Sequence, residues 1–138
     1  MIVADLSSQA DVKQAAEVFL SMEKPLDILL NNAGIMNRER NETIDGLEEV
    51  FSVNHLAYFT FTLLLAEKLK NTSGSRVVNV ASGAHQFVKD MNFEDLQSEK
   101  TFRPMQVYGQ SKLANILFTK SLSEKLSSFG VTVNCLHP

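Results

Sequence analysis

The sequence predicts an α/β protein that is built around a parallel sheet. Short apolar runs of the strand type alternate with longer segments of helical spacing, which is typical of strand-helix-strand units. Hydrophobic residues make up 44% of the 138 residues and charged residues 21%, close to the values of soluble globular domains. We therefore expect one domain with its own core over residues 1–138. The apolar runs that we expect to form strands are 2–6, 26–30, 77–81 and 131–136.

Charge and hydropathy argue against several functional classes. The formal net charge is -3, and the basic residues are scattered rather than gathered in a stripe, so no nucleic-acid partner is expected. The longest apolar stretch, 56–66, is well short of the ~20 residues that span a bilayer. The amino end lacks the charged start and long apolar core of a signal peptide, so we expect an intracellular protein.

The first half of the sequence predicts two helices around the run 26–30. Ser8 is a suitable N-cap, and Asp11, three residues later, completes a capping-box pattern. Pro25 ends this helix, and the run 26–30 has the composition of a strand that is covered on both faces. Residues 47–70 form the second helix and close with lysines that suit its negative end. The apolar face of the first helix is expected to consist of Val12, Ala15, Ala16 and Phe19.

The second half predicts two strands and one long helix. Residues 77–81 form a buried strand, and the connection that follows, up to Pro104, has no clear period. Long connections of this kind often carry function. Pro104 suits the first turn of a helix that runs to about Ser128 and is terminated by Gly130. Cys135, the single cysteine, is expected as a small core residue in the buried strand 131–136.

Tyr108 and Lys112 are four residues apart on the predicted helix, so their side chains lie on one face about one turn apart. A phenol has a pKa of ~10, too high for a base at neutral pH. A cation ~4 Å away at an effective dielectric of ~20 contributes ~4 kcal/mol, or ~3 pKa units. Lys112 could therefore bring Tyr108 close to neutrality, where a proton shuttle works best. Taken alone, the pair also fits an ordinary surface tyrosine and lysine.

Polar residues follow two of the predicted strands. The sequence Asn-Asn-Ala-Gly at 31–34 follows one strand, and Ser82 follows the next. Ligands of parallel sheets bind outside the carboxyl ends of the strands, so we expect these residues to meet at one rim. Each could also belong to an ordinary turn. Asn54 lies among apolar residues inside the predicted helix, where a buried amide needs a specific partner; the alternative is a half-exposed asparagine.

Several motifs stand in a recognisable order along the chain. They are Asp5-Leu6, Asn31-Asn32-Ala33-Gly34, Val53-Asn54, Val80-Ala81-Ser82, Tyr108-Gly109-Gln110-Ser111-Lys112 and His137-Pro138. In this order they resemble the short-chain dehydrogenases/reductases over essentially the whole chain. The stretches 92–97 and 108–118 resemble the branch of the retinol dehydrogenases and WW-domain oxidoreductases. The resemblance implies a Rossmann-like doubly wound parallel sheet, truncated to the third to sixth strands of the family fold with their intervening helices.

The resemblance implies an oxidoreductase that transfers a hydride between NAD or NADP and the carbonyl or alcohol group of an apolar substrate, such as a retinoid, steroid or lipid aldehyde. Tyr108 would be the acid/base, and Lys112 would lower its pKa and hold the nicotinamide ribose. Ser82 would hydrogen-bond the substrate oxygen, and Asn54 would anchor a water that links Lys112 to solvent. The cofactor would be contacted by Asp5, Leu6, Asn32, Ala33, Gly34, Val53, Tyr108, Lys112 and Pro138.

The chain departs from the family pattern at both ends. The family opens with a strand, a Gly-rich turn and a helix that hold the pyrophosphate, and no such motif occurs here. The charge that distinguishes NAD from NADP follows the second strand, so the preference is open. The family also continues beyond the position of Pro138. We therefore expect a fragment or truncated isoform that, in isolation, binds the cofactor poorly and shows no turnover.

The expected truncation has a consequence for the sheet. In a strand order of 3-2-1-4-5-6, residues 2–6 would be an orphan strand beside three adjacent ones. The strand 26–30 would expose an unpaired apolar edge, which predicts self-association.

Two alternatives stand beside the oxidoreductase. One is a catalytically silent truncated isoform that acts as a binding or regulatory piece, and cofactor titration would distinguish it. The other is an epimerase or dehydratase of the extended branch, which shares Tyr-x-x-x-Lys but seldom has Asn-Asn-Ala-Gly. The spacings of His55, His85 and His137 match no zinc pattern, so no metal is expected. The aromatic residues expected in the core, or in a homo-oligomer contact by family analogy, are Phe51, Phe59 and Phe61.

Overall fold

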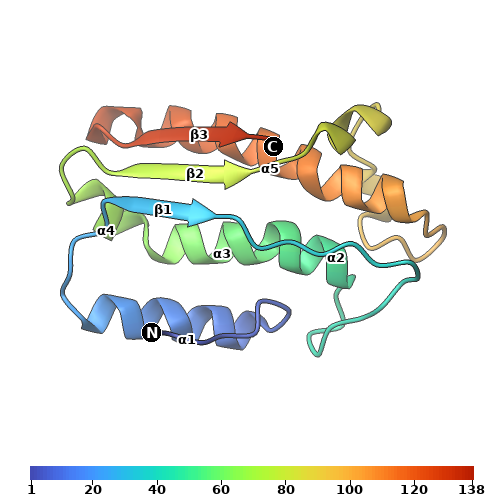
Figure 1. Cartoon of the computed structure of the whole chain (residues 1–138), viewed down its shortest axis with the longest axis horizontal. Coiled ribbons are helices and arrows are strands. Elements are labelled where there is room, and N and C mark those ends of the chain that lie inside the picture. Colours follow the sequence, from blue (N-terminus) through green and yellow to red (C-terminus); the bar gives the residue numbers. More distant parts are fainter.

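The protein forms two layers, seen in a computed structural model that describes all residues from Met1 to Pro138 (Figure 1). One layer is a parallel sheet of three strands in the order β1-β2-β3. The long helices make up the second layer and lie on one face of this sheet (Figure 1). The prediction of three adjacent parallel strands is confirmed. Their bounds are Ile28–Asn31 for β1, Arg76–Val80 for β2 and Thr132–Leu136 for β3.

The helices follow the predicted order but are more often interrupted. The segment predicted as one helix at 47–70 contains a π-helical turn and a break at Leu65, whose φ is −93° and ψ 1°. The connection after β2 contains two short 3-10 helices. The α-helices are α1 (Gln9–Ser21), α2 (Glu49–Phe51), α3 (Ala57–Leu64), α4 (Ala66–Lys70) and α5 (Pro104–Leu126), and the others are η1 (Ser52–Leu56, π), η2 (Gly83–Phe87), η3 (Phe93–Asp95) and η4 (Ser127–Phe129).

A single row of apolar side chains joins the three strands to the helices. The register places Leu29 opposite Val77 and Val77 opposite Val133, and all three are buried on the helical face. Leu69 of α4 and Leu122 of α5 pack against this row within one apolar cluster. Each fully buried leucine or valine stabilises the fold by about 1.5–3 kcal/mol, so this row holds the two layers together.

The start of α1 confirms Ser8 as the N-cap but lacks the second bond of a capping box, because the Ser8 backbone N–H donates to the Asp5 carbonyl and not to Asp11. The Ser8 hydroxyl accepts from the Asp11 backbone N–H at 3.2 Å and donates to the Asp11 carboxylate at 3.1 Å. The helix ends at Ser21, four residues before Pro25. Of the predicted apolar face, Val12, Ala15 and Ala16 are buried and Phe19 packs partly against the core.

The prediction of a strand at residues 2–6 is wrong, because the first strand of the structure begins at Ile28. Met1 and Val3 are exposed, and no strand pairs with the free edge of β1. A strand needs a hydrogen-bonded neighbour, and without one the apolar pattern does not suffice. The chain turns instead, because the Asp5 carboxylate accepts from the Ser7 backbone N–H at 2.9 Å and from its hydroxyl at 2.8 Å.

The outer strands are covered on one face only, which corrects two predictions of fully buried strands. In β1, Leu29 is buried, whereas Ile28 and Leu30 are 62% and 58% exposed. In β3, Leu136 is 49% exposed and Cys135 is exposed rather than in the core. The sequence pattern is that of strands between two helical layers, but helices lie on only one face of this sheet (Figure 1).

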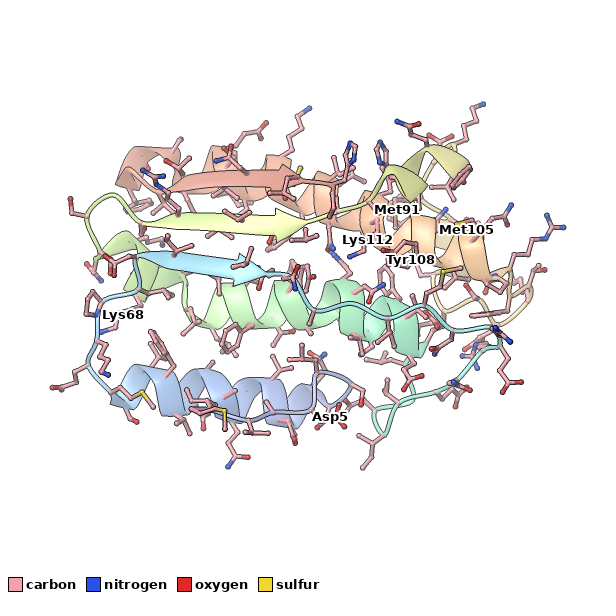
Figure 2. The ribbon with its side chains drawn as sticks, viewed as in Figure 1. Asp5, Lys68, Met91, Met105, Tyr108 and Lys112 are labelled. Carbon is pink, nitrogen blue, oxygen red and sulfur yellow. The ribbon has the colours of Figure 1, made fainter.

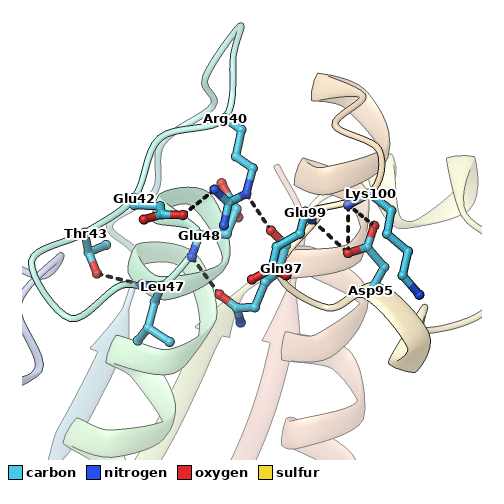
Figure 3. Close-up of polar contacts among 9 residues, drawn as sticks. All are labelled: Arg40, Glu42, Thr43, Leu47, Glu48, Asp95, Gln97, Glu99 and Lys100. Atoms are coloured by element: carbon cyan, nitrogen blue, oxygen red, sulfur yellow. Dashed lines mark hydrogen bonds and ion pairs between the residues drawn. The ribbon is translucent and has the colours of Figure 1, made fainter.

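Two loops are joined beyond the carboxyl ends of the strands (Figure 3). Arg40 donates from Nε to the Gln97 carbonyl at 2.9 Å, and Gln97 Oε1 accepts from the Glu48 N–H at 2.7 Å. The buried Glu48 carboxylate caps α2 by accepting from the N–H groups of Val50 and Phe51. Burial raises the pKa of Glu48, and these N–H groups partly offset that effect. The network fixes the beginning of the helix that carries Asn54.

The contact between α5 and η2 can be tested at Gly109. A Cβ at this position would lie 2.6 Å from the Ala84 carbonyl oxygen, so the backbone would have to move. We expect Gly109→Ala to lower the free energy of unfolding by about 1–3 kcal/mol in urea, although alanine favours helix by ~1 kcal/mol. Gly83→Ala is the control, because a Cβ there meets nothing within 4 Å. Equal stability of Gly109→Ala and the native chain would contradict this packing.

The bare face of the sheet predicts self-association of the 138-residue chain. Ile28 and Leu30 present apolar side chains on an edge strand, which is a surface that favours pairing with other chains. We expect dimers or larger species in sedimentation velocity, and a shift toward monomer when both residues are changed to threonine. Ile44→Thr is the control, since Ile44 is 88% exposed in a loop. A monomeric native chain at ~100 μM would contradict the prediction.

Candidate active site

Tyr108 and Lys112 lie on one face of α5, close to the end of β2 (Figure 2). Lys112 is only 2% exposed, and its Nζ donates to the Val80 carbonyl at 3.0 Å. The same Nζ lies 5.6 Å from the centre of the Tyr108 ring. Burial lowers the pKa of Lys112, because the ammonium loses contact with water. The fold thus keeps a cation close to a phenol in a poorly hydrated place.

Ser82 is the second residue after β2 and is placed by backbone geometry. Its φ of −158° and ψ of 151° are extended, and its hydroxyl caps η2 by accepting from the Ala84 N–H at 3.2 Å. Its side chain borders a pocket of about 300 Å³ at the carboxyl ends of the strands. The residues that line this pocket are Asn32, Gly34, Val80, Ala81, Ser82, Tyr108, Lys112 and Pro138.

Asn54 is fully buried within the π-helical turn η1. Its Oδ1 accepts from the Ile35 N–H at 2.7 Å, and its Nδ2 donates to the Ile35 carbonyl at 2.9 Å. The same Nδ2 donates to the Ser111 hydroxyl at 3.1 Å. One amide therefore joins the helix to the loop that follows β1 and to α5. The specific partner that a buried asparagine requires is the Ile35 backbone.

Gly34 is the point at which Asn54 and Lys112 approach each other. A Cβ at Gly34 would lie 3.3 Å from Asn54 Oδ1 and 3.4 Å from Lys112 Nζ. A side chain here would therefore crowd the buried Asn54 amide and Lys112 Nζ, of which Lys112 also borders the 300 Å³ pocket. Glycine lets the loop after β1 lie against both of these atoms.

The structure separates the remaining predicted residues from this pocket. Asp5 is exposed beside α1, away from Tyr108 and Lys112 (Figure 2). The hydrogen bonds from Ser7 lower the pKa of the Asp5 carboxyl. Leu6 lines a second pocket of about 300 Å³, between α1 and β1, together with Asn32 and Ala33. Val53 is buried in η1. Asn32 therefore borders both pockets, whereas Asp5, Leu6, Ala33 and Val53 lie outside the pocket that contains Tyr108.

Sequence reasoning missed two side chains that support the site. Tyr58, which is buried, donates from its hydroxyl to the Ala33 carbonyl at 2.7 Å, and its ring centre lies 5.9 Å from Lys112 Nζ. Burial raises the pKa of Tyr58, which keeps its phenol protonated. Ser111 donates to the Tyr108 carbonyl at 2.7 Å and accepts from Asn54. The only sequence signal was helical spacing, since Tyr58 follows Asn54 by four residues.

The histidines have separate polar partners. His55 Nδ1 lies 2.9 Å from Asn115 Oδ1, and His85 Nδ1 lies 2.7 Å from the Ser82 carbonyl oxygen. His137 faces His85 with 6.2 Å between ring centres. The structure contains no group of three or more His, Cys, Asp or Glu side chains suited to a metal. None of its helices combines the length and apolar character that a membrane span requires.

Comparisons with known proteins agree with the resemblance seen in the sequence. Retinol dehydrogenase 12 of Mus musculus is 47% identical over 97% of this chain, which covers 42% of that protein. A crystal structure of an uncharacterized protein from Mycobacterium Paratuberculosis has a TM-score of 0.85 at 36% identity, over 98% of this chain and 48% of the other. A short chain dehydrogenase from Burkholderia cenocepacia J2315, in complex with NADP, has a TM-score of 0.75 at 30% identity, over 98% and 50%.

The chain therefore spans less than half the length of the curated relatives it matches. The family model for short chain dehydrogenases matches residues 1–138, which is the whole of the sequence. This match, together with the relatives and the parallel α/β architecture, shows that the chain belongs to the short-chain dehydrogenase family.

Proposed function

We propose that this chain carries the proton-transfer half of an NAD(P)-dependent oxidoreductase that acts on a carbonyl or hydroxyl group. The observation that carries the proposal is the buried Lys112 ammonium beside Tyr108, in a pocket that also contains Ser82. Such an arrangement places a charge, a titratable hydroxyl and a second hydroxyl at the carboxyl end of a parallel strand, where ligands of this sheet type bind.

Tyr108 is the proton donor in reduction and the acceptor in oxidation. The positive charge of Lys112, with its Nζ 5.6 Å from the ring centre, stabilises the phenolate that remains after the proton has left. Ser82 is exposed to the same pocket, and its hydroxyl can donate to the substrate oxygen while accepting from the Ala84 N–H. Two hydroxyl groups would then hold one oxygen and orient the reacting carbon.

The residues around Gly34 fit the nicotinamide ribose part of the cofactor. Gly34 and Lys112 both line the 300 Å³ pocket, and Lys112 Nζ has three protons of which it gives only one to the Val80 carbonyl. The other two can reach ribose hydroxyls. When bound, the nicotinamide supplies or accepts the hydride. Crystal structures of similar proteins in complex with NADP and with NADPH support this class of cofactor.

The other half of the cofactor has few candidate contacts in this chain. A pocket of about 300 Å³ is at the lower end of the size range for small-molecule sites and is too small for a whole dinucleotide. No Gly-rich turn that could hold a pyrophosphate occurs in residues 1–138. Asp5 and Leu6 remain candidates for the adenine end, with Asn32 and Ala33 along the path between them.

Asn54 is proposed to hold a water near Lys112. Its Oδ1 accepts one hydrogen bond, from Ile35, and retains a second lone pair. Because Oδ1 and Lys112 Nζ both lie beside Gly34, a water within reach of both atoms would bridge them and return a proton to Lys112. The substrate is proposed to be apolar, of the retinoid, steroid or lipid aldehyde class, which agrees with the retinol dehydrogenases among the relatives.

In a full-length version of the protein, Tyr108→Phe is expected to remove nearly all turnover. The change deletes the hydroxyl that exchanges the proton and keeps the ring, so cofactor affinity should change little. Steady-state kinetics with an apolar aldehyde and NADPH, together with a fluorescence titration of NADPH, measure both quantities. Retention of more than about a tenth of the native rate would contradict the role of Tyr108, since a positioned acid/base contributes ~100-fold or more.

Lys112→Ala is expected to weaken cofactor binding as well as turnover, because Lys112 is proposed to serve both the phenolate and the ribose. The dissociation constant of NADPH should rise about 10-fold or more, which corresponds to the loss of a charge-assisted hydrogen bond. Lys120→Ala is the matched control, since Lys120 is an exposed lysine of the same helix. A change in rate alone would rule out the contact with the ribose.

A further inference from the structure

The helix that carries Asn54 is wider than an α-helix at this residue. Within η1 the Ala57 N–H bonds to the Ser52 carbonyl five residues earlier, instead of four. The carbonyl of Asn54 accepts a hydrogen bond from outside the helix, because Nδ2 of Asn115 on α5 donates to it at 2.8 Å. A side chain that inserts into the hydrogen-bond ladder of a helix is a known cause of such distortions.

The orientation of the Asn115 amide is fixed from its other side. Its Oδ1 lies 2.9 Å from His55 Nδ1. An amide oxygen can only accept, so the proton of this bond is on Nδ1 of the imidazole. Burial lowers the pKa of His55, so the ring is neutral at pH 7 and has this one N–H. If the amide were reversed, its oxygen would face the oxygen of the Asn54 carbonyl and that bond would be lost, while His55 would have to move its proton to Nε2.

These groups cannot exchange their partners for water. Asn54 and Asn115 are both fully buried. The His55 ring is packed among three aromatic rings, with 5.2 Å between ring centres to Phe51, 6.1 Å to Phe118 and 6.2 Å to Phe59. A buried amide that loses a partner in such surroundings must either move or stay unsatisfied.

We propose that Asn115, held in place by His55, is a positioning residue of the active site. It fixes the Asn54 backbone in the π-helical turn, so that the Asn54 side chain keeps its bonds to Ile35 and Ser111. Asn54 Oδ1 then stays beside Gly34, where Lys112 Nζ also lies. The inference rests on the proposed function, because it assigns to Asn115 a part in the proton transfer of that site.

Asn115→Leu tests the inference by two readouts in the full-length protein. The first is solvent exchange of the Asn54 Nδ2 protons, followed by NMR after selective ¹⁵N-asparagine labelling. We expect slow exchange in the native protein and exchange at least about 10-fold faster in the variant. The second is kinetics, where we expect kcat to fall about 10-fold to 100-fold while the KM for the cofactor changes less than about threefold.

Thr119→Val is the matched control. Thr119 is one helical turn beyond Asn115 on α5. Its hydroxyl accepts from Asn79 Nδ2 at 2.9 Å and donates to the Asn115 backbone carbonyl at 2.7 Å, but no hydrogen bond joins it to Asn54 or to the Asn115 side chain. This change removes two buried bonds and leaves the bond from Asn115 Nδ2 to the Asn54 carbonyl in place. We expect a loss of stability with Asn54 exchange and kcat close to native values. A similar fall in kcat in both variants would mean that Asn115 acts only through general stability, and would overturn the proposal.

The two readouts separate the failure of this inference from that of the proposed function. Unchanged exchange of the Asn54 amide in Asn115→Leu would overturn the inference whatever the kinetics. Faster exchange with native kcat would also overturn it, because Asn54 would then have no part in turnover. Turnover that survives Tyr108→Phe would instead refute the proposed function. If Asn115→Leu does not fold, Asn115→Asp gives the same test, since it keeps the acceptor toward His55 and loses the donor toward Asn54.

Discussion

The site depends on one buried amide, that of Asn54. Its side chain binds the Ile35 backbone through both of its polar atoms and reaches Ser111 on α5. Asn54 therefore holds three segments in one arrangement: the loop after β1, the helix that begins with α2, and the separate helix α5. Because an unsatisfied buried amide costs about 1–3 kcal/mol, the loop cannot leave this position cheaply. The position of Gly34 beside Lys112 Nζ follows from that constraint.

Lys112 is the second buried polar group on which the site depends. A buried ammonium with one carbonyl partner is costly to the fold, and the lowered pKa of Lys112 expresses that cost. The buried side chains of Thr62, Asn31, Asn79 and Thr119, by comparison, are paired with one another in a continuous chain of hydrogen bonds. Lys112 differs from these side chains because its unused protons face a pocket rather than another protein group, as is expected of a functional cation.

Much of the fold could be predicted from local pattern, and the failures have physical causes. Apolar runs predicted β1, β2 and β3, and the Ser8 N-cap predicted the start of α1, because each of these signals lies within a few residues. The strand predicted at residues 2–6 is absent because a strand depends on a hydrogen-bonded neighbour, which no local pattern contains. The π-helical turn could not be predicted because the helical periodicity over residues 47–70 is continuous in the sequence. The partners of Asn54 were invisible, since the bonds to Ile35 involve backbone atoms that have no sequence signature.

A crystal structure of the full-length protein with NADP and an apolar carbonyl compound bound would show whether this pocket is the active site. We expect the hydroxyls of Tyr108 and Ser82 both to lie within hydrogen-bond distance of the carbonyl oxygen, about 2.5–3.0 Å. We also expect Lys112 Nζ to contact the nicotinamide ribose beside Gly34. A carbonyl oxygen bound away from Tyr108, or a ribose out of reach of Lys112, would contradict the assignment of this pocket as the active site.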